Sequence, residues 1–238
     1  ADSNPESQFV WIDGWNQGQT NLKPIAYAME ESIDLAGYLA AAYSTSKVVS
    51  TYGGLDIPAV TAFMDGFYYG AKAYEAETGT AVTVLGRDPI AGTGSFTDPA
   101  LNFGDTEGAK AISSGFLAEG SDVIFPVAGG LFASTAEAIT ESGSDTAVFL
   151  GVDKNIAVTS PEFADLVLTS VEKRMTQAVF DIIEDLSSGG EFTVDAYLGT
   201  LENDGTALSE SDKISDELLA KLEELKAGII DGSIDPLA

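Results

Sequence analysis

The sequence predicts an α/β fold in which parallel sheets are flanked by helices. Short apolar stretches alternate with amphipathic ones along the whole chain, a pattern typical of strand–helix–strand units. Residues 122–127 (DVIFPV) are rich in β-branched and aromatic side chains, as expected of a strand covered on both faces. This strand stops at Ala128-Gly129-Gly130, where a parallel sheet would place either a tight turn or a ligand.

Each predicted element has a local reason in the sequence. The helix at 30–44 has an acidic first turn, the helix at 55–77 has Pro58 near its start, and the helix at 171–190 ends in paired glycines. Further helices are expected at 106–118, at 135–141 and after the capping residue Ser215. Strands are expected at residues 9–13, 25–29, 47–54, 81–87, 122–127, 147–153 and 165–170, with a strand and a turn in 192–205.

Composition excludes several classes of function. With 38 acidic and 11 basic residues the net charge is −27, so nucleic acid and anionic lipid are poor partners. The 238 residues include no histidine and no cysteine, which removes catalytic triads, thiolate chemistry and the commonest metal ligands. We therefore expect no metal and no cofactor. No stretch is apolar enough to span a membrane, and the first residues do not resemble a signal peptide.

Small or polar residues follow four of the predicted strands. They are Asp13, Gly53 to Asp56, Val127 to Gly130, and Gly151 to Asp153. In open α/β sheets ligands bind at the carboxyl ends of the strands, and glycine there lets backbone N–H groups approach the ligand.

Read in order, several stretches resemble the basic membrane protein family, the purine-nucleoside-receptor-like substrate-binding lipoproteins of ABC importers. The matching stretches are NPESQFVWID, ESIDLAGYLAAAYS, GGLDIP, FMDGFYYGAKAY, GSFTDP, SDVIFPVAGG, FLGVD, VLTSVEKR and LKAGIIDGSI. The resemblance covers nearly all of the chain from Asn4 onward and implies the type I periplasmic-binding fold. It also implies that a cleft between two lobes binds a purine nucleoside, with a riboflavin-like compound as the second choice of ligand. The implied partner is a membrane permease. Two stretches depart from the family pattern near the expected ligand, AGGLFAST and the longer GSFTDPALNFGDTEGAK.

The resemblance further implies about 100 additional residues before this chain. We therefore expect an incomplete amino-terminal lobe, a missing amino-terminal segment and an extracytoplasmic location with a lipid anchor through that segment. The expected division is 1–44 for the remainder of the amino-terminal lobe, 45–160 for the carboxyl-terminal lobe and 161–238 for crossover elements.

Eight residues are candidate ligand contacts. Asp153 could accept two hydroxyl hydrogen bonds from a ribose, and the resemblance implies that Lys173, expected at a helix start, reaches the sugar. Each also has a purely structural interpretation, as a turn aspartate and as a solvated lysine. Gly129 and Gly130 would offer backbone contacts, Phe125 and Phe132 could stack on a flat base or simply fill the core, and Asp13 and Asp56 could face the cleft.

Three alternatives stay open. Asp13, Asp56 and Asp153 could serve a nucleoside- or sugar-processing enzyme that works with carboxylate pairs. A ligand sensor of the same fold would have the same site. Ser170 to Lys173 also matches S-x-x-K, a serine-nucleophile motif, but its partner motifs are absent. We expect a binding protein rather than an enzyme.

Overall fold

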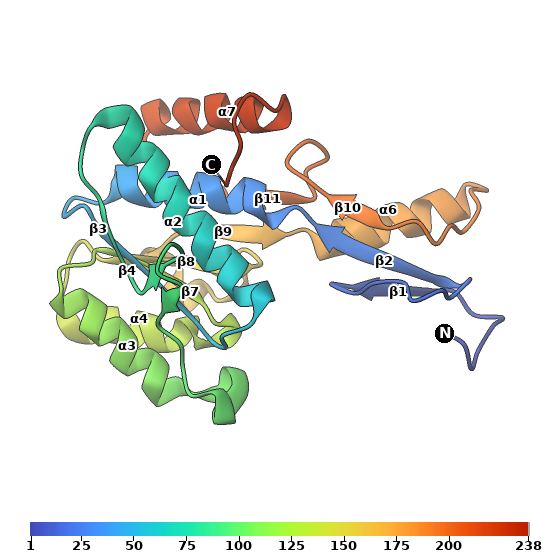
Figure 1. Cartoon of the computed structure of the whole chain (residues 1–238), viewed down its shortest axis with the longest axis horizontal. Coiled ribbons are helices and arrows are strands. Elements are labelled where there is room, and N and C mark those ends of the chain that lie inside the picture. The colour runs from blue at the N-terminus through green and yellow to red at the C-terminus, as the bar shows by residue number, and fades with distance from the viewer. Residues whose placement is uncertain (238) are drawn as a thin grey trace. The chain divides into compact units, whose positions relative to one another are not determined.

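The computed structural model describes residues 1–237, and contacts between Cα atoms divide the chain into two compact units (Figure 1). Unit 1 comprises Ala1–Met29 and Lys173–Ala207, and unit 2 comprises Glu30–Glu172 and Leu208–Ala238. These bounds differ from the expected division at 44/45 and 160/161. Helix α1 (Met29–Tyr43) belongs almost entirely to unit 2, because its backbone packs closely against that of α2 (Pro58–Thr78). The approach is so close that a Cβ atom at Gly70 of α2 would lie 2.0 Å from the carbonyl oxygen of Asp34 in α1.

Unit 2 is built on a six-stranded sheet with the order β11-β9-β8-β7-β3-β4. Strands β4, β3, β7, β8 and β9 pair in parallel with one another, and helices cover both faces, with α3 and α4 on one side and α1, α2 and α7 on the other (Figure 1). The bounds of these strands are β3 Val48–Gly53, β4 Thr83–Leu85, β7 Val123–Val127, β8 Val148–Asp153, β9 Val167–Lys173 and β11 Thr206–Leu208. The helices are α3 Thr106–Ala118, α4 Phe132–Ser142, α5 Ile156–Thr159 and α7 Asp216–Ile230, with 3₁₀ turns η1 Pro99–Gly104, η2 Gly129–Leu131 and η3 Pro161–Leu166. The predicted fold class is confirmed.

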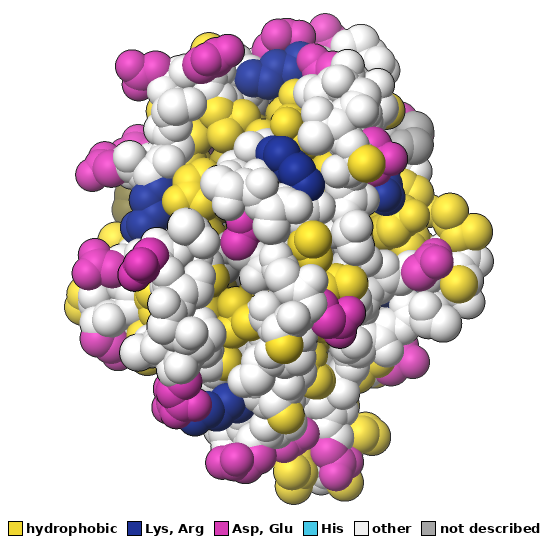
Figure 2. Space-filling model, turned by 90° about the vertical axis from the view of Figure 1, so that its left-hand side faces the viewer, with side chains coloured by type: hydrophobic (Ala, Val, Ile, Leu, Met, Phe, Trp, Pro, Cys, Tyr) yellow, Lys and Arg dark blue, Asp and Glu magenta, His cyan; other side chains and the backbone are white. Residues whose placement is uncertain are grey.

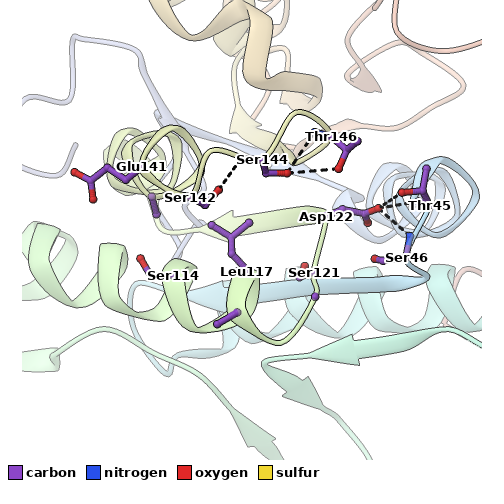
Figure 3. A pocket seen from close by; sticks show the side chains of 13 residues that line it. Thr45, Ser46, Ser114, Leu117, Ser121, Asp122, Glu141, Ser142, Ser144 and Thr146 are labelled. Atoms are coloured by element: carbon purple, nitrogen blue, oxygen red, sulfur yellow. Dashed lines mark hydrogen bonds between the residues drawn. The ribbon is translucent and has the colours of Figure 1, made fainter.

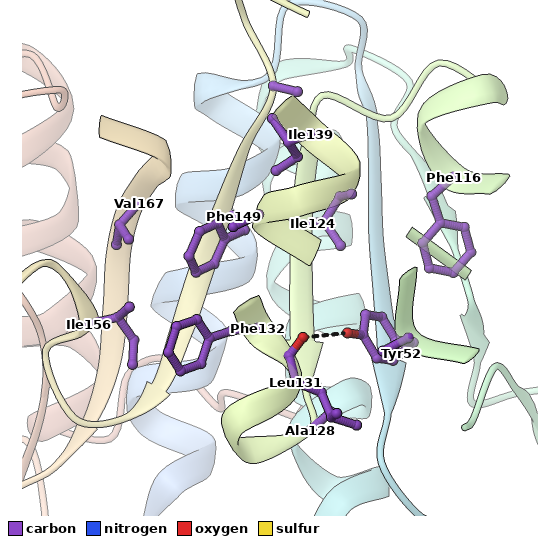
Figure 4. Packing of buried hydrophobic residues seen from close by; sticks show 13 residues of the cluster. Tyr52, Phe116, Ile124, Ala128, Leu131, Phe132, Ile139, Phe149, Ile156 and Val167 are labelled. Carbon is purple, nitrogen blue, oxygen red and sulfur yellow. Dashed lines mark hydrogen bonds between the residues drawn. The ribbon is translucent and has the colours of Figure 1, made fainter. Parts of the chain in front are cut away.

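The core under α3 and α4 is a continuous apolar cluster (Figure 4). Phe132 stacks on Phe149 with ring centroids 6.0 Å apart, and Tyr52 is fully buried among aliphatic side chains. The hydroxyl groups of Tyr52 and Thr135 lie 2.9 Å apart, so the polar end of this tyrosine is satisfied inside the core. Burying one side chain such as Phe149 contributes roughly 1.5–3 kcal/mol to folding, so this cluster fixes the strands that carry the candidate site.

Unit 1 contains a three-stranded parallel sheet with the order β1-β2-β10. Its strands are β1 Phe9–Ile12, β2 Leu22–Tyr27 and β10 Tyr197–Gly199, and its helix is α6 Met175–Ser187. The expectation that residues 9–13 form a buried strand is wrong in part: the strand exists, but Val10 and Trp11 are each 41% exposed. The reason is the position of β1 at the edge of the sheet.

Three other predicted elements differ from those observed. The strand expected at 81–87 ends at Leu85, since Gly86 adopts a left-handed φ of +79° before the short pair β5 (Arg87–Asp88) and β6 (Thr93–Gly94). The helix expected at 171–190 starts only at Met175, because β9 continues through Lys173. In 192–205 the strand is only β10, Tyr197–Gly199, and the turn after it leads to β11 in the other sheet.

The surface matches the acidic composition. On the face shown in Figure 2, acidic side chains are scattered around the outline, with few lysines and arginines among them. Across residues 1–237, no helix combines the length and apolar character needed to cross a bilayer.

Candidate functional site

The carboxyl edge of the unit 2 sheet begins with paired glycines after β3. Gly53 pairs with Val127 of β7, and the Gly54 N–H donates to the Val127 carbonyl at 3.0 Å, so the two strand ends are held side by side. A Cβ atom at Gly54 would lie 2.3 Å from Cδ1 of Phe103. Any larger residue at Gly54 would displace that ring.

The turn after β7 is open. Gly129 has a left-handed φ of +55°, a conformation that glycine adopts without a steric cost. A Cβ atom at Gly129 or at Gly130 would meet nothing within 4 Å. The backbone of this turn is therefore accessible to a small molecule.

Two acidic residues belong to the same edge. Asp153 is the last residue of β8 and has a left-handed φ of +67°, and Asp56 is exposed in the segment between β3 and α2. Because β3, β7 and β8 are parallel neighbours, Asp56, Gly129, Gly130 and Asp153 all follow or end strands at one edge. A left-handed backbone at a non-glycine residue is uncommon and concentrates at turns and functional sites.

The other two polar candidates lie in unit 1 and form an ion pair. Lys173 Nζ is 2.9 Å from Asp13 Oδ2, with the lysine side chain 14% exposed and the aspartate side chain 54% exposed. Asp13 follows β1 with a left-handed φ of +56°. Lys173 does not lie in the first turn of a helix as expected: it ends β9, directly before Arg174, the N-cap of α6. Its ammonium group pairs with the Asp13 carboxylate.

The two aromatic candidates belong to the core. Phe125 is fully buried with its ring centroid 5.3 Å from that of Phe67, so neither of its faces is open to a ligand. Phe132 is 8% exposed, between Phe149 and Phe163. Burial therefore gives Phe125 and Phe132 a structural role in the core, not the predicted stacking role. Strand β7 is buried on both faces, and this removes any open side for Phe125.

Phe103, an aromatic residue on the open edge, was not among the residues predicted for the site. It lies in η1, is 39% exposed and rests on Gly54. The signal was present in the unusual length of GSFTDPALNFGDTEGAK, since an extended segment beside a ligand site can carry new contacts.

A cavity of about 590 Å³ lies at the opposite, amino end of the same sheet (Figure 3). Its most buried acid, Asp122, accepts hydrogen bonds from the N–H groups of Thr45 and Ser46 at 2.8 and 2.9 Å and from the Thr45 hydroxyl at 2.8 Å. The Ser144 side chain accepts from the N–H groups of Thr146 and Ala147. Asp122 and Ser144 thus already accept hydrogen bonds from the loops around the cavity. We therefore interpret these residues as stabilising the loops and not as binding a ligand.

The serine-nucleophile alternative does not fit the geometry. Ser170 is fully buried, and its Oγ accepts a hydrogen bond from the Ile156 N–H at 3.0 Å. Ser170 and Lys173 lie on a strand, where residues three apart point to opposite faces. The hydroxyl and the amine are therefore not positioned to share a proton.

Comparison with solved structures identifies the fold. A solute-binding protein of an ABC transporter system from Aeropyrum pernix K1 matches with a TM-score of 0.78 and 22% identity, over 99% of this chain and 72% of that one. This similarity shows the fold alone, the type I periplasmic-binding fold.

The family follows from the sequence. The family model for ABC transporter substrate-binding proteins that are PnrA-like, Bmp, matches residues 1–235, and the chain belongs to this family. The ABC transporter nucleoside-binding protein BmpA of Lactococcus lactis subsp. cremoris is 29% identical over 98% of this chain. An uncharacterised lipoprotein of Pyrococcus furiosus is 29% identical over 77% of it. The chain spans 65% of the length of the Lactococcus protein and 44% of that of the Pyrococcus protein.

Proposed function

We propose that this chain acts as the solute-binding component of an ABC importer and that its ligand is a purine nucleoside. The observation that carries the proposal is the open glycine turn at Gly129 and Gly130, beside Asp153 at one sheet edge, in a chain of this family. A permease in the membrane is the partner, and an extracytoplasmic, lipid-anchored location accords with the lipoprotein among the relatives.

Each candidate has a role in the proposal. The backbone N–H groups of the glycine turn hydrogen-bond the ligand, and the Asp153 carboxylate accepts two hydrogen bonds from ribose hydroxyls. Lys173, oriented by Asp13, contributes the cationic contact of unit 1, and Asp56 adds a further acceptor in unit 2. A riboflavin-like ligand is the second choice because it is also flat and hydroxylated.

The test is isothermal titration calorimetry of the full chain with inosine, guanosine, adenosine, cytidine, free ribose and riboflavin. We expect at least one purine nucleoside to bind more tightly than cytidine or ribose. Chromatography of the same mixtures checks for release of the free base, which would instead support the carboxylate-pair enzyme. If no nucleoside or flavin bound, the proposal would be wrong.

The first mutational prediction concerns Asp153. Asn tolerates the left-handed backbone there, so Asp153→Asn removes the charge with little strain. We expect affinity to fall roughly 10- to 150-fold, as for loss of a hydrogen bond to a charged group worth about 1.5–3 kcal/mol. The matched control is Asp145→Asn in the exposed segment between α4 and β8, which should bind like the wild type. Equal affinities for the two variants would remove Asp153 from the site.

A further inference from the structure

A short hairpin follows β4 at the carboxyl edge of the unit 2 sheet. Its strands are β5 (Arg87–Asp88) and β6 (Thr93–Gly94), which pair antiparallel. Because β4 runs parallel to β3, the hairpin leaves the sheet at the edge where the paired glycines end β3. None of the eight candidate ligand contacts lies in the hairpin.

The base of the hairpin is tied to α2 and closed by hydrogen bonds. Arg87, whose side chain is 10% exposed, forms an ion pair with Asp65 of α2, in which Nε and Oδ1 are 2.6 Å apart. The same guanidinium donates through Nη1 to the Thr93 carbonyl at 3.3 Å, across the hairpin. The Ser95 N–H donates to the Gly86 carbonyl at 2.9 Å. The hairpin therefore has a fixed position on unit 2.

The tip of the hairpin is also ordered. Asp88 Oδ1 accepts hydrogen bonds from the N–H groups of Ile90 and Ala91 at 2.9 and 3.0 Å, so the carboxylate holds the turn from inside. Gly92 then adopts a left-handed φ of +69°, which leads the chain back into β6. A turn that is ordered in advance loses little conformational entropy when a partner binds it.

Ile90 is the side chain that this turn presents to solvent. It is 82% exposed, and no other large apolar side chain among residues 1–237 is as exposed. An isoleucine left in water contributes little to folding, so the stability of unit 2 does not account for it. A rigidly held apolar side chain is instead typical of the anchors that fill pockets in protein–protein interfaces.

Charge and position indicate what kind of partner receives this tip. Arg87 is the only basic residue in 86–105 and is already paired, whereas Asp88, Asp98 and Asp105 add three acidic groups. Such a surface is repelled by anionic lipid and attracted by a protein surface with basic residues. The proposed ligand binds at this same edge, so a permease that receives the ligand has to approach it.

We propose that Ile90, at the tip of the β5–β6 hairpin, is the anchor by which unit 2 docks onto the permease. Its side chain enters an apolar socket on the extracytoplasmic face of the permease, and basic residues around the socket face the acidic segment. This inference rests on the proposed function and names the surface that meets its partner. The ion pair between Arg87 and Asp65 positions the anchor on α2.

The experiment measures ligand binding and uptake with the same variants. Ile90→Asp should bind the purine nucleoside with wild-type affinity in calorimetry, because the proposed ligand contacts lie outside the hairpin. In cells that produce the variant in place of the wild type, uptake of the radiolabelled nucleoside should fall at least roughly 10-fold, as for loss of an interface anchor. Ile90→Leu should support wild-type uptake. The matched control is Leu219→Asp on α7, where an apolar side chain that is 41% exposed receives the same charge, and uptake should be unchanged.

Photo-crosslinking identifies the partner directly. Ile90→p-benzoylphenylalanine, irradiated in intact cells, should join the chain to a membrane-spanning subunit of an ABC transporter, identified by mass spectrometry. Leu219→p-benzoylphenylalanine should not. Thermal unfolding establishes that each variant is folded, and Ile90→Ser serves if Ile90→Asp is not.

The outcomes separate this inference from the proposed function. If the wild type binds no nucleoside, the proposed function fails and this inference with it. If the wild type binds its nucleoside while Ile90→Asp or its substitute supports wild-type uptake, this inference alone is overturned. Crosslinks from position 90 only to lipid or to a second copy of the chain would overturn it as well.

Discussion

Asp122 shows how a single carboxylate can hold a loop. At the start of β7 it accepts hydrogen bonds from Ser44, Thr45 and Ser46, the residues that lead from α1 into β3. Burial alone would raise the pKa of Asp122, but the hydrogen bonds from Ser44, Ser46 and Thr45 outweigh burial and hold it below its usual range. The carboxylate is thus ionised and satisfied inside unit 2.

We therefore predict that Asp122→Ala lowers the free energy of unfolding by about 2–3 kcal/mol at pH 7, because buried donors lose their acceptor. Since the folded pKa is lowered, this contribution is present above the unfolded pKa of about 3.9 and is lost as the pH falls through the folded value. Urea denaturation measures the change, and the exposed Asp145→Ala should stay within about 0.5 kcal/mol of the wild type. A difference below 1 kcal/mol between the two variants would contradict the assignment of Asp122 as the holding residue.

Asp34 has the opposite effect on stability. It lies buried on α1, and burial together with the charge of Asp235 raises its pKa to about 7. Between the unfolded value of about 3.9 and this folded value, the folded protein binds the extra proton. Stability from this group is therefore fully present below the unfolded pKa and is lost as the pH rises through 7.

Asp34→Asn should accordingly stabilise the protein at pH 8 by up to about 4 kcal/mol, since each pKa unit corresponds to about 1.4 kcal/mol. At pH 5, above the isoelectric point of 4.1, the gain should shrink by more than half. Urea denaturation at both pH values measures the gain. Asp235→Asn should give a smaller gain, as the lesser cause of the shift. A gain that did not depend on pH would show that packing, not the charge of Asp34, is responsible.

At the scale of elements, the sequence predicts best where a local signal and the tertiary environment agree. The helix at 106–118 is confirmed at both ends. Asp105 caps its start by accepting from the Gly108 N–H, and Gly120, with a left-handed φ of +94°, follows its end. The start of α6 could not be predicted, since Glu172 and Lys173 favour a helix in isolation but lie in β9 through pairing with β8. That pairing joins residues far apart in the sequence.

The candidate site follows the same rule. Strand ends such as Gly129 and Asp153 were predictable, because a parallel sheet brings its carboxyl ends to one edge whatever the detailed packing. The sequence could not predict which aromatic ring faces that edge. Phe125, Phe132 and Phe103 have the same chemistry and differ only in burial. Exposure is decided by neighbours such as Phe67 and Gly54, which no local pattern specifies.

At the scale of the molecule, charge is the dominant feature. The chain has 38 acidic and 11 basic residues, a net charge of −27, and some of its lysines each pair with two carboxylates. Lys221 bridges Glu77 of α2 and Glu224 of α7 at 2.7 and 3.0 Å, and Lys110 bridges Glu137 and Glu141 of α4 at 3.4 and 2.7 Å. Added salt weakens such surface pairs, but it also screens repulsion among the remaining acids.

We predict that repulsion outweighs the ion pairs, so that raising NaCl from 10 to 500 mM, concentrations with Debye lengths of about 30 and 4 Å, increases the free energy of unfolding. The expected gain is roughly 1–2 kcal/mol, because each repulsive pair of exposed carboxylates costs about as much as one exposed ion pair contributes, and salt screens a few such pairs. Urea denaturation at pH 7.5 measures it, and KCl should act like NaCl because screening depends on ionic strength and not on the cation. Lys221→Met, which removes the bridge between α2 and α7, should enlarge the salt response, since a pair that salt weakens has been replaced by further repulsion. If the wild type instead lost stability in salt, the prediction would be wrong. The ion pairs of its few basic residues would then stabilise the fold by more than repulsion among the acidic residues destabilises it.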